Sequence, residues 1–175
     1  GDSLEGKRCI VTGSGMMALS VAKKLVDLGA TVLTLSDSSG YIYEQSGLDA
    51  SRLDIINKIK KDRGARIGRY IMSSTTAKYA DTADLLSIPC DLVFPSSGNV
   101  NAIDDDAVNT LADNGCMGVI EAGHMPSTPK AILAYKQRGM LHGPYKASLA
   151  AGGPIVNGAQ LSEFPIMTKD RSEER

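Results

Sequence analysis

Short apolar runs alternate along the chain with longer segments in which apolar residues recur at helical spacing. Residues 8–12 form one such run and predict a buried strand, and residues 31–35 form a second one that is rich in β-branched residues. Between them, residues 16–28 carry an apolar stripe on one face, which predicts a helix that ends at Gly29. The first forty residues therefore predict a strand, a glycine turn, a helix, a second strand and an acidic turn.

The rest of the chain repeats this alternation. We expect a loop or short hairpin at 41–47, helices at 49–63, near 67–72, at 104–114, from 127 to about 138 and near 155–162, and strands near 78–80, within 88–95 between its prolines, at 118–121 and at 140–141. Residues 166–175 are charged and predict a frayed end. This order predicts an α/β fold that is Rossmann-like and doubly wound, with a mostly parallel sheet, helices on both faces and a single domain over residues 1–175.

Composition and charge exclude several classes of protein. Among 175 residues, 19 are Lys or Arg and 20 are Asp or Glu, so the net charge of -1 provides no basic excess for nucleic acid. No apolar run approaches the roughly 18 residues that a membrane span needs, and residues 1–6 do not resemble a signal peptide. We expect a cytoplasmic protein that binds neither nucleic acid nor membrane, with a longer mitochondrial or plastid precursor left open.

The cysteines and histidines show no metal-binding pattern. Cys9, Cys90 and Cys116 are widely spaced and odd in number, so we interpret them as reduced and structural. Neither His124 nor His142 stands at metal-ligand spacing from other ligand residues, and we therefore expect no metal site.

A glycine turn joins the first predicted strand to the first predicted helix. Residues 13–18 read Gly-Ser-Gly-Met-Met-Ala and fit the dinucleotide-binding pattern G-x-G-x-x-A. The first glycine permits a tight turn, the second lets a diphosphate approach the backbone, and the helix N-terminus presents free N–H groups. Asp37, at the end of the second strand, is placed to accept hydrogen bonds from a ribose diol. The alternative is a turn that only connects a strand to a helix in a sheet that binds nothing.

Small polar loops follow the carboxyl ends of four predicted strands. They span residues 13–15, 36–39, 96–99 and 121–124. Because ligands of such sheets bind at this edge, the four loops together predict a cofactor cleft. No catalytic constellation accompanies them. His124 is either a proton carrier or an ordinary polar loop residue, and Lys146 is either an anion contact or a surface lysine.

Several motifs occur in the order in which a known family carries them. They lie at residues 4–8, 13–15, 28–30, 36–40, 101–104, 121–128 and 144–147. In this order they resemble the cofactor domain of hexameric glutamate dehydrogenases, over residues 3 to about 164, and the Ser-Asp-Ser turn at 36–38 is most like the NADP-using branch. The resemblance implies an oxidoreductase that uses NAD(P) in the reversible deamination of L-glutamate to 2-oxoglutarate and ammonia, and a sheet with one reversed strand.

The glycine turn and the resemblance together predict which residues contact ligands. The cofactor contacts are Gly13, Ser14, Gly15, Met16, Met17, Asp37, Ser38, Ser96, Ser97, Asn101, Gly123 and His124. The resemblance places Asn157 where the family has a serine that binds the distal carboxylate of glutamate. It also favours NADP, whereas Asp37 alone would repel a 2′-phosphate, so the predicted cofactor is NAD(P).

The chain departs from the family's motifs at several of these positions. Met16 and Met17 replace Asn-Val, and His124 and Leu149 each replace an asparagine. The family's catalytic lysine and aspartate lie in an N-terminal substrate domain that we expect to be absent here, so no catalytic residue is predicted. The family is homo-hexameric, and we expect this chain to be a monomer or a dimer. Two hypotheses follow: the cofactor domain of a glutamate dehydrogenase-like enzyme that is inactive alone, or a diverged non-catalytic nucleotide-binding or regulatory module.

Overall fold

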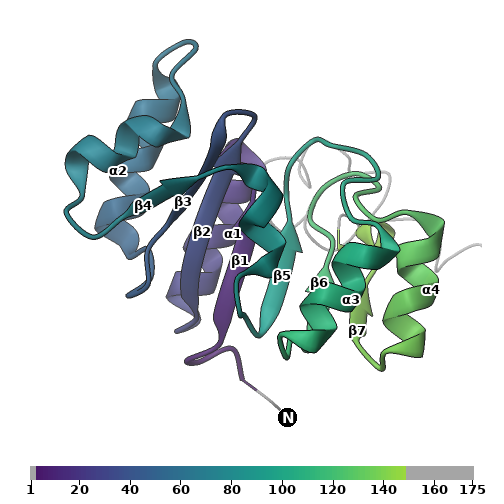
Figure 1. Ribbon diagram of the computed structural model, residues 1–175. Coiled ribbons are helices and arrows are strands. Elements are labelled where there is room, and N and C mark those ends of the chain that lie inside the picture. The colour runs from purple at the N-terminus through teal and green to yellow at the C-terminus, as the bar shows by residue number, and fades with distance from the viewer. Residues whose placement is uncertain (1–2, 149–175) are drawn as a thin grey trace, which may run out of the picture.

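A seven-stranded sheet runs through the middle of the molecule, with helices packed against both of its faces (Figure 1). The computed structural model describes residues 3–148. The strands are β1 (Arg8–Thr12), β2 (Thr31–Asp37), β3 (Gly40–Tyr43), β4 (Lys78–Ala80), β5 (Leu92–Pro95), β6 (Gly118–Ile120) and β7 (Leu141–Gly143). The helices are α1 (Met16–Asp27), α2 (Ala50–Lys61), α3 (Asp105–Asp113) and α4 (Pro129–Gln137), with 3-10 helices η1 (Ile67–Ser73) and η2 (Thr82–Ser87).

The strands lie in the order β4-β3-β2-β1-β5-β6-β7, and five of them, from β2 to β7 across the sheet, are parallel. Strand β3 runs antiparallel to both of its neighbours, so it is the one reversed strand that the resemblance implies. The predicted α/β class, the mostly parallel sheet and the helices on both faces are confirmed. A hairpin is present, but it begins earlier than the expected 41–47: β2 continues to Asp37, the two-residue turn Ser38–Ser39 follows, and Gly40–Tyr43 is its second strand.

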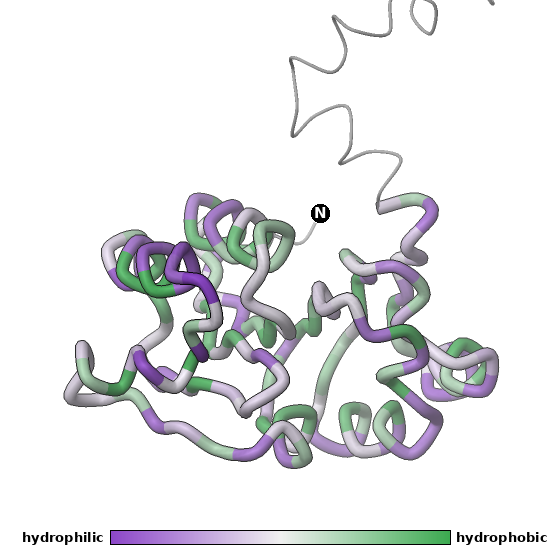
Figure 2. The backbone as a smooth tube through the Cα atoms, turned by 90° about the horizontal axis from the view of Figure 1, so that it is seen from above, coloured by the Kyte–Doolittle hydropathy of each residue, from purple (hydrophilic) through white to green (hydrophobic). Residues whose placement is uncertain are grey.

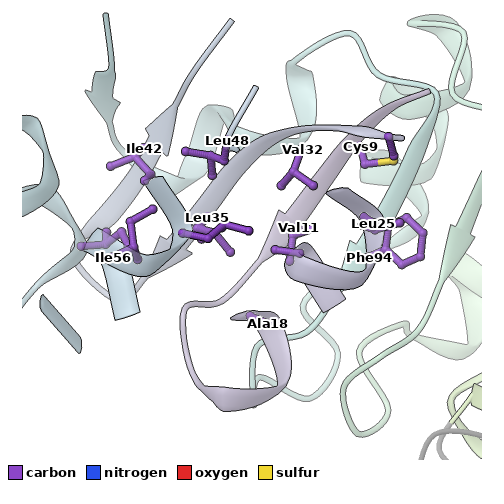
Figure 3. Close-up of a cluster of buried hydrophobic side chains, with 14 of the residues drawn as sticks. Cys9, Val11, Ala18, Leu25, Val32, Leu35, Ile42, Leu48, Ile56 and Phe94 are labelled. Atoms are coloured by element: carbon purple, nitrogen blue, oxygen red, sulfur yellow. The ribbon is translucent and has the colours of Figure 1, made fainter. Parts of the chain in front are cut away.

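Alternation of side chains along the strands divides the core into two layers. Cys9 and Val11 of β1 point toward α1, α2 and η1, whereas Ile10 points toward η2, α3 and α4. Seen from above, coiled segments accordingly lie on both sides of the strands (Figure 2). The first layer is drawn in Figure 3, where Leu25 of α1 lies beside Phe94 of β5. Burying a leucine of this kind stabilises the fold by about 2 kcal/mol.

A buried carboxylate anchors η1 to the end of β3. Glu44 is fully buried and accepts hydrogen bonds from Tyr70 Oη (3.3 Å), Ser74 Oγ (2.6 Å) and Thr76 Oγ1 (2.7 Å). Burial opposes ionisation, but these hydroxyl donors and the nearby Arg52 outweigh it and lower the pKa of Glu44. The segment that carries η1 is therefore fixed to the sheet by polar contacts as well as by Ile67 in the core.

Helix starts agree with their capping residues. Asp49, Asp104 and Thr128 each accept a hydrogen bond from a backbone N–H of the first turn of α2, α3 and α4. Helix η2 is not predicted from the sequence, because a 3-10 helix of six residues is too short to show an apolar period. The expected helix near 155–162 and the frayed end lie outside the described residues.

All three cysteine side chains are buried at the amino edge of the sheet. Cys9 is the second residue of β1, Cys90 precedes β5 and Cys116 precedes β6, and each is a free thiol with at most 5% exposure. Burial raises the pKa of Cys9 to about 12. None of the helices between residues 3 and 148 is both long and apolar enough to cross a membrane.

Candidate functional site

The strand order changes direction at β1. From β1 the chain moves through α1 to β2 on one side, and the strand on the other side of β1 is β5. Loops after β1 and β5 therefore leave the sheet in different directions, which opens the crevice where ligands of doubly wound sheets bind. The glycine turn at 13–15 and the loop at 96–99 meet at this point.

Gly13 brings these two loops into direct backbone contact. Its φ is +91°, and a Cβ atom there would lie 3.0 Å from the carbonyl oxygen of Ser96 and 3.0 Å from the amide nitrogen of Ser97. Both the conformation and the space therefore require glycine. Gly123, after β6, continues the contact, because a Cβ there would lie 2.6 Å from the carbonyl oxygen of Ser97. The loops after β1, β5 and β6 thus abut at one edge of the sheet.

The N-terminus of α1 points into open space. Gly15 is its N-cap residue, no side chain caps the helix, and a Cβ on Gly15 would meet no atom within 4 Å. The amide N–H groups of the first turn are consequently available to an anion, with the positive end of the helix dipole behind them. Met16 is 86% exposed and Met17 42% exposed, so neither side chain fills the turn.

A cavity of about 450 Å³ lies beside this helix end. Ser14, Gly15 and Met16 line it from the glycine turn and α1, and Asn57 and Lys60 line it from α2. A crevice of this volume is within the range of small-molecule sites in proteins.

Asp37 is held by its own chain rather than left open. Oδ1 accepts from the amide and hydroxyl of Ser39 (2.9 and 2.5 Å), and Oδ2 accepts from the amide of Ile67 (2.7 Å) and from Lys60 Nζ (3.2 Å). Burial raises the pKa of this carboxyl, but the four donors outweigh it and lower the pKa to about 2. A carboxylate offers about four lone-pair sites, so Asp37 has little capacity left for a ribose diol.

Two cations contact neighbouring residues of this turn, Arg66 at Ser38 and Lys60 at Asp37. Arg66 donates to Ser38 Oγ (2.5 Å). Lys60 donates to the neighbouring residue, Asp37, and also to the carbonyl oxygen of Ala65 (3.0 Å). We call Ser38, Lys60 and Arg66 the basic corner. Lys60 and Arg66 are not among the residues predicted from the sequence, because each stands in a charged segment that resembles an ordinary solvated surface.

The opposite end of the crevice lies beyond β5 and β6. Asn101 and Met125 both adopt left-handed backbone conformations (φ of 56° and 46°), and the amide of Asn101 donates to the carbonyl oxygen of Met125 (2.9 Å). His124 is exposed, and its ring meets the ring of Tyr145 edge-on with 5.1 Å between centroids. Buried Glu121 fixes that partner by accepting from the amide of Tyr145 (2.9 Å).

The predicted cofactor contacts form one continuous edge in the structure. From the basic corner it passes through Asp37, the glycine turn, Ser96, Ser97 and Gly123 to His124 and Asn101. Ser96 itself is buried and donates to the carbonyl oxygen of Phe94 (3.1 Å), so it braces the loop. Asn157 lies outside the described residues. Between residues 3 and 148, no cluster of His, Cys, Asp and Glu is arranged to hold a metal ion.

A doubly wound sheet, a glycine turn at its switch point and an uncapped helix end define a dinucleotide-binding domain of the Rossmann type. Comparison with known proteins places it more narrowly. Residues 1–167 match the family described as Glutamate/Leucine/Phenylalanine/Valine dehydrogenase, and the chain belongs to this family.

Individual relatives agree with that assignment. The chain is 37% identical over 174 residues to a glutamate dehydrogenase of Bacteroides thetaiotaomicron, covering 99% of this chain and 38% of the relative. It is 38% identical over 172 residues to an NADP-specific glutamate dehydrogenase of Helicobacter pylori, covering 94% and 37%. The crystal structure of Plasmodium falciparum glutamate dehydrogenase superposes with a TM-score of 0.82 at 38% identity, covering 90% of this chain and 33% of that one.

The chain thus spans little more than a third of the length of these relatives, and it corresponds to their NAD(P)-binding portion. A hetero-hexameric glutamate dehydrogenase of Thermus thermophilus, at 20% identity and a TM-score of 0.65, shares the fold.

Proposed function

We propose that this chain binds NADP(H) and forms the cofactor-binding part of a glutamate dehydrogenase. The observation that carries the proposal is the pairing of an open glycine turn with a basic corner at the end of β2. Gly15 leaves room for a diphosphate at the amide groups of α1, and exposed Met16 does not obstruct it. The bound dinucleotide would supply the hydride acceptor for deamination of L-glutamate.

The basic corner supports NADP over NAD. A 2′-phosphate carries close to two negative charges and offers oxygen atoms that Lys, Arg and Ser bind. Arg66 contacts Ser38 and Lys60 contacts the adjacent Asp37, so two positive charges lie at this turn, and Asp37 neutralises only one of them. Because the oxygens of Asp37 are already occupied, its usual preference for a free ribose diol is weakened here.

Among the described residues, Glu121 Oε1 and His142 Nε2 lie 3.2 Å apart, but the two side chains are largely buried, and the one predicted substrate contact, Asn157, lies outside the described residues. We therefore propose that deamination requires the substrate-binding part that the family's enzymes carry, and that residues 1–175 alone show no turnover. The open space at Gly15 supports a cofactor site that can still bind over a diverged module that has lost binding. A module that no longer bound a cofactor would not need this space to stay open.

The test is a comparison of NADPH and NADH binding by isothermal titration calorimetry. We expect a Kd in the micromolar to millimolar range for NADPH, and binding of NADH weaker by about tenfold or more. Lys60→Gln and Arg66→Gln should each weaken NADPH binding by about tenfold and leave NADH binding nearly unchanged.

Lys24→Gln is the matched control, because Lys24 is an exposed lysine of α1 that neither lines the cavity nor takes part in the basic corner. Its affinity for both cofactors should equal that of the unaltered chain. Equal affinity of the unaltered chain for NADPH and NADH would refute the NADP preference, and no heat with either at millimolar concentration would refute cofactor binding itself.

A further inference from the structure

We propose that Ser36 is a positioning residue that holds the glycine turn in the form that receives a phosphate. This inference rests on the proposed function and concerns the same crevice. Ser36 is the second-last residue of β2 and is 5% exposed, so it cannot touch a ligand across the turn. Its side chain instead reaches the first glycine of the turn.

Two hydrogen bonds join Ser36 to Gly13. The amide of Gly13 donates to Ser36 Oγ (2.8 Å), and the amide of Ser36 donates to the carbonyl oxygen of Gly13 (3.0 Å). The first of these is buried, so no solvent molecule replaces Oγ if it is lost. Both hydrogen-bonding groups of the Gly13 backbone are therefore committed to one residue.

The opposite side of Gly13 is closed by the loop after β5. A Cβ on Gly13 would lie 3.0 Å from atoms of Ser96 and Ser97, so the turn cannot shift in that direction. Ser36 closes the remaining side. Held between the two, the turn directs the amides that follow Gly15 outward, toward the position of a diphosphate.

Ser36 also links the two anion sites of the crevice. In a strand, neighbouring side chains point to opposite faces, and Asp37, the next residue, holds Lys60 of the basic corner. The last two residues of β2 therefore fix the glycine turn and the basic corner relative to each other. We therefore expect the two places to receive the two phosphates of one ligand, as in the adenosine half of NADP.

The test uses the full chain and three ligands: NADPH, adenosine 2′,5′-bisphosphate and adenosine 2′-monophosphate. Only the last lacks a phosphate for the glycine turn. We expect Ser36→Ala to weaken NADPH and the bisphosphate by about tenfold and to change the monophosphate by less than about twofold. A residue with only a structural role would affect all three ligands alike.

Thr34→Val is the matched control. Thr34 lies two residues earlier on the same face of β2, is equally buried, and donates its hydroxyl to the carbonyl oxygen of Val11 (3.3 Å) rather than to the turn. The Thr34→Val variant should lose about as much stability as Ser36→Ala and should bind all three ligands as tightly as the unaltered chain. Ser36→Thr keeps the hydroxyl and should restore most of the NADPH affinity.

Unchanged NADPH affinity in Ser36→Ala, or equal weakening of all three ligands, would overturn the role of Ser36. If Ser36→Ala does not fold, Ser36→Cys decides, since a thiol fills the site but accepts a hydrogen bond poorly, and the same selective loss is expected. Absence of NADPH binding by the unaltered chain would show instead that the proposed function has failed, and the positioning role with it.

Discussion

The two glycines of the turn, Gly13 and Gly15, are required for different reasons. Gly13 adopts φ +91° and packs against backbone atoms of the next loop, whereas Gly15 has an ordinary backbone conformation and faces open space. The first glycine is needed by the fold and the second by the ligand. The G-x-G-x-x-A pattern predicts the turn but does not separate these two requirements, because the separation depends on Ser96 and Ser97, more than eighty residues away in sequence.

Substitution at the two positions should therefore give opposite results. Gly15→Val should keep the unfolding midpoint close to that of the unaltered chain but reduce NADPH affinity by at least about a hundredfold, since the side chain occupies the place of the diphosphate. Gly13→Ala should instead lower stability by about 2 kcal/mol or more, through a strained φ and overlap with Ser96. Urea unfolding and calorimetry measure both effects, and a Gly15→Val variant that binds NADPH normally would contradict the site.

At the scale of elements, Asp37 joins three segments that are distant in sequence. It ends β2, binds Lys60 of α2 and binds the amide of Ile67 at the start of η1. The partners follow Asp37 by 23 and 30 residues. From the sequence alone, an acid at this position is expected to bind a ribose. The sequence does not show that α2 and η1 return to the same carboxylate and occupy it.

The lowered pKa of Asp37 has a consequence for acid stability. The pKa falls from 3.8 to about 2 on folding, so this group stabilises the fold fully above about pH 4, and that stabilisation is lost as the pH falls toward 2. The full contribution is about 2 kcal/mol. We expect Asp37→Asn to flatten the dependence of unfolding free energy on pH between 4 and 2, with the remaining slope due partly to Glu44.

Asp62→Asn provides the comparison for that measurement, because Asp62 pairs with Arg69 on the exposed surface. Its pH profile should match the unaltered chain. Identical profiles for Asp37→Asn and the unaltered chain would show that the carboxylate is not held as described.

At the scale of the whole molecule, the sequence predicts features that depend on neighbouring residues and misses features that depend on contacts between distant segments. The strand, turn, helix and strand of residues 8–37 are predictable, because apolar periodicity and glycine act within a few residues. The basic corner is not, since Arg66 meets Ser38 only after a reversed strand and a helix have brought η1 back to the end of β2. The parallel order of β1, β5 and β6 follows from the alternation of strand and helix.

The three buried thiols at the amino edge of the sheet can be used to measure how often the protein unfolds. None of Cys9, Cys90 and Cys116 is accessible in the folded state, and all lie at the end of the sheet away from the crevice. A disulfide reagent added in low denaturant should therefore label all three at one common rate, set by global unfolding. NADPH at a hundred times its Kd should slow that labelling about a hundredfold without touching a single sulfur atom. A cysteine that is labelled earlier than the other two would show instead that its part of the sheet unfolds locally, independently of the rest.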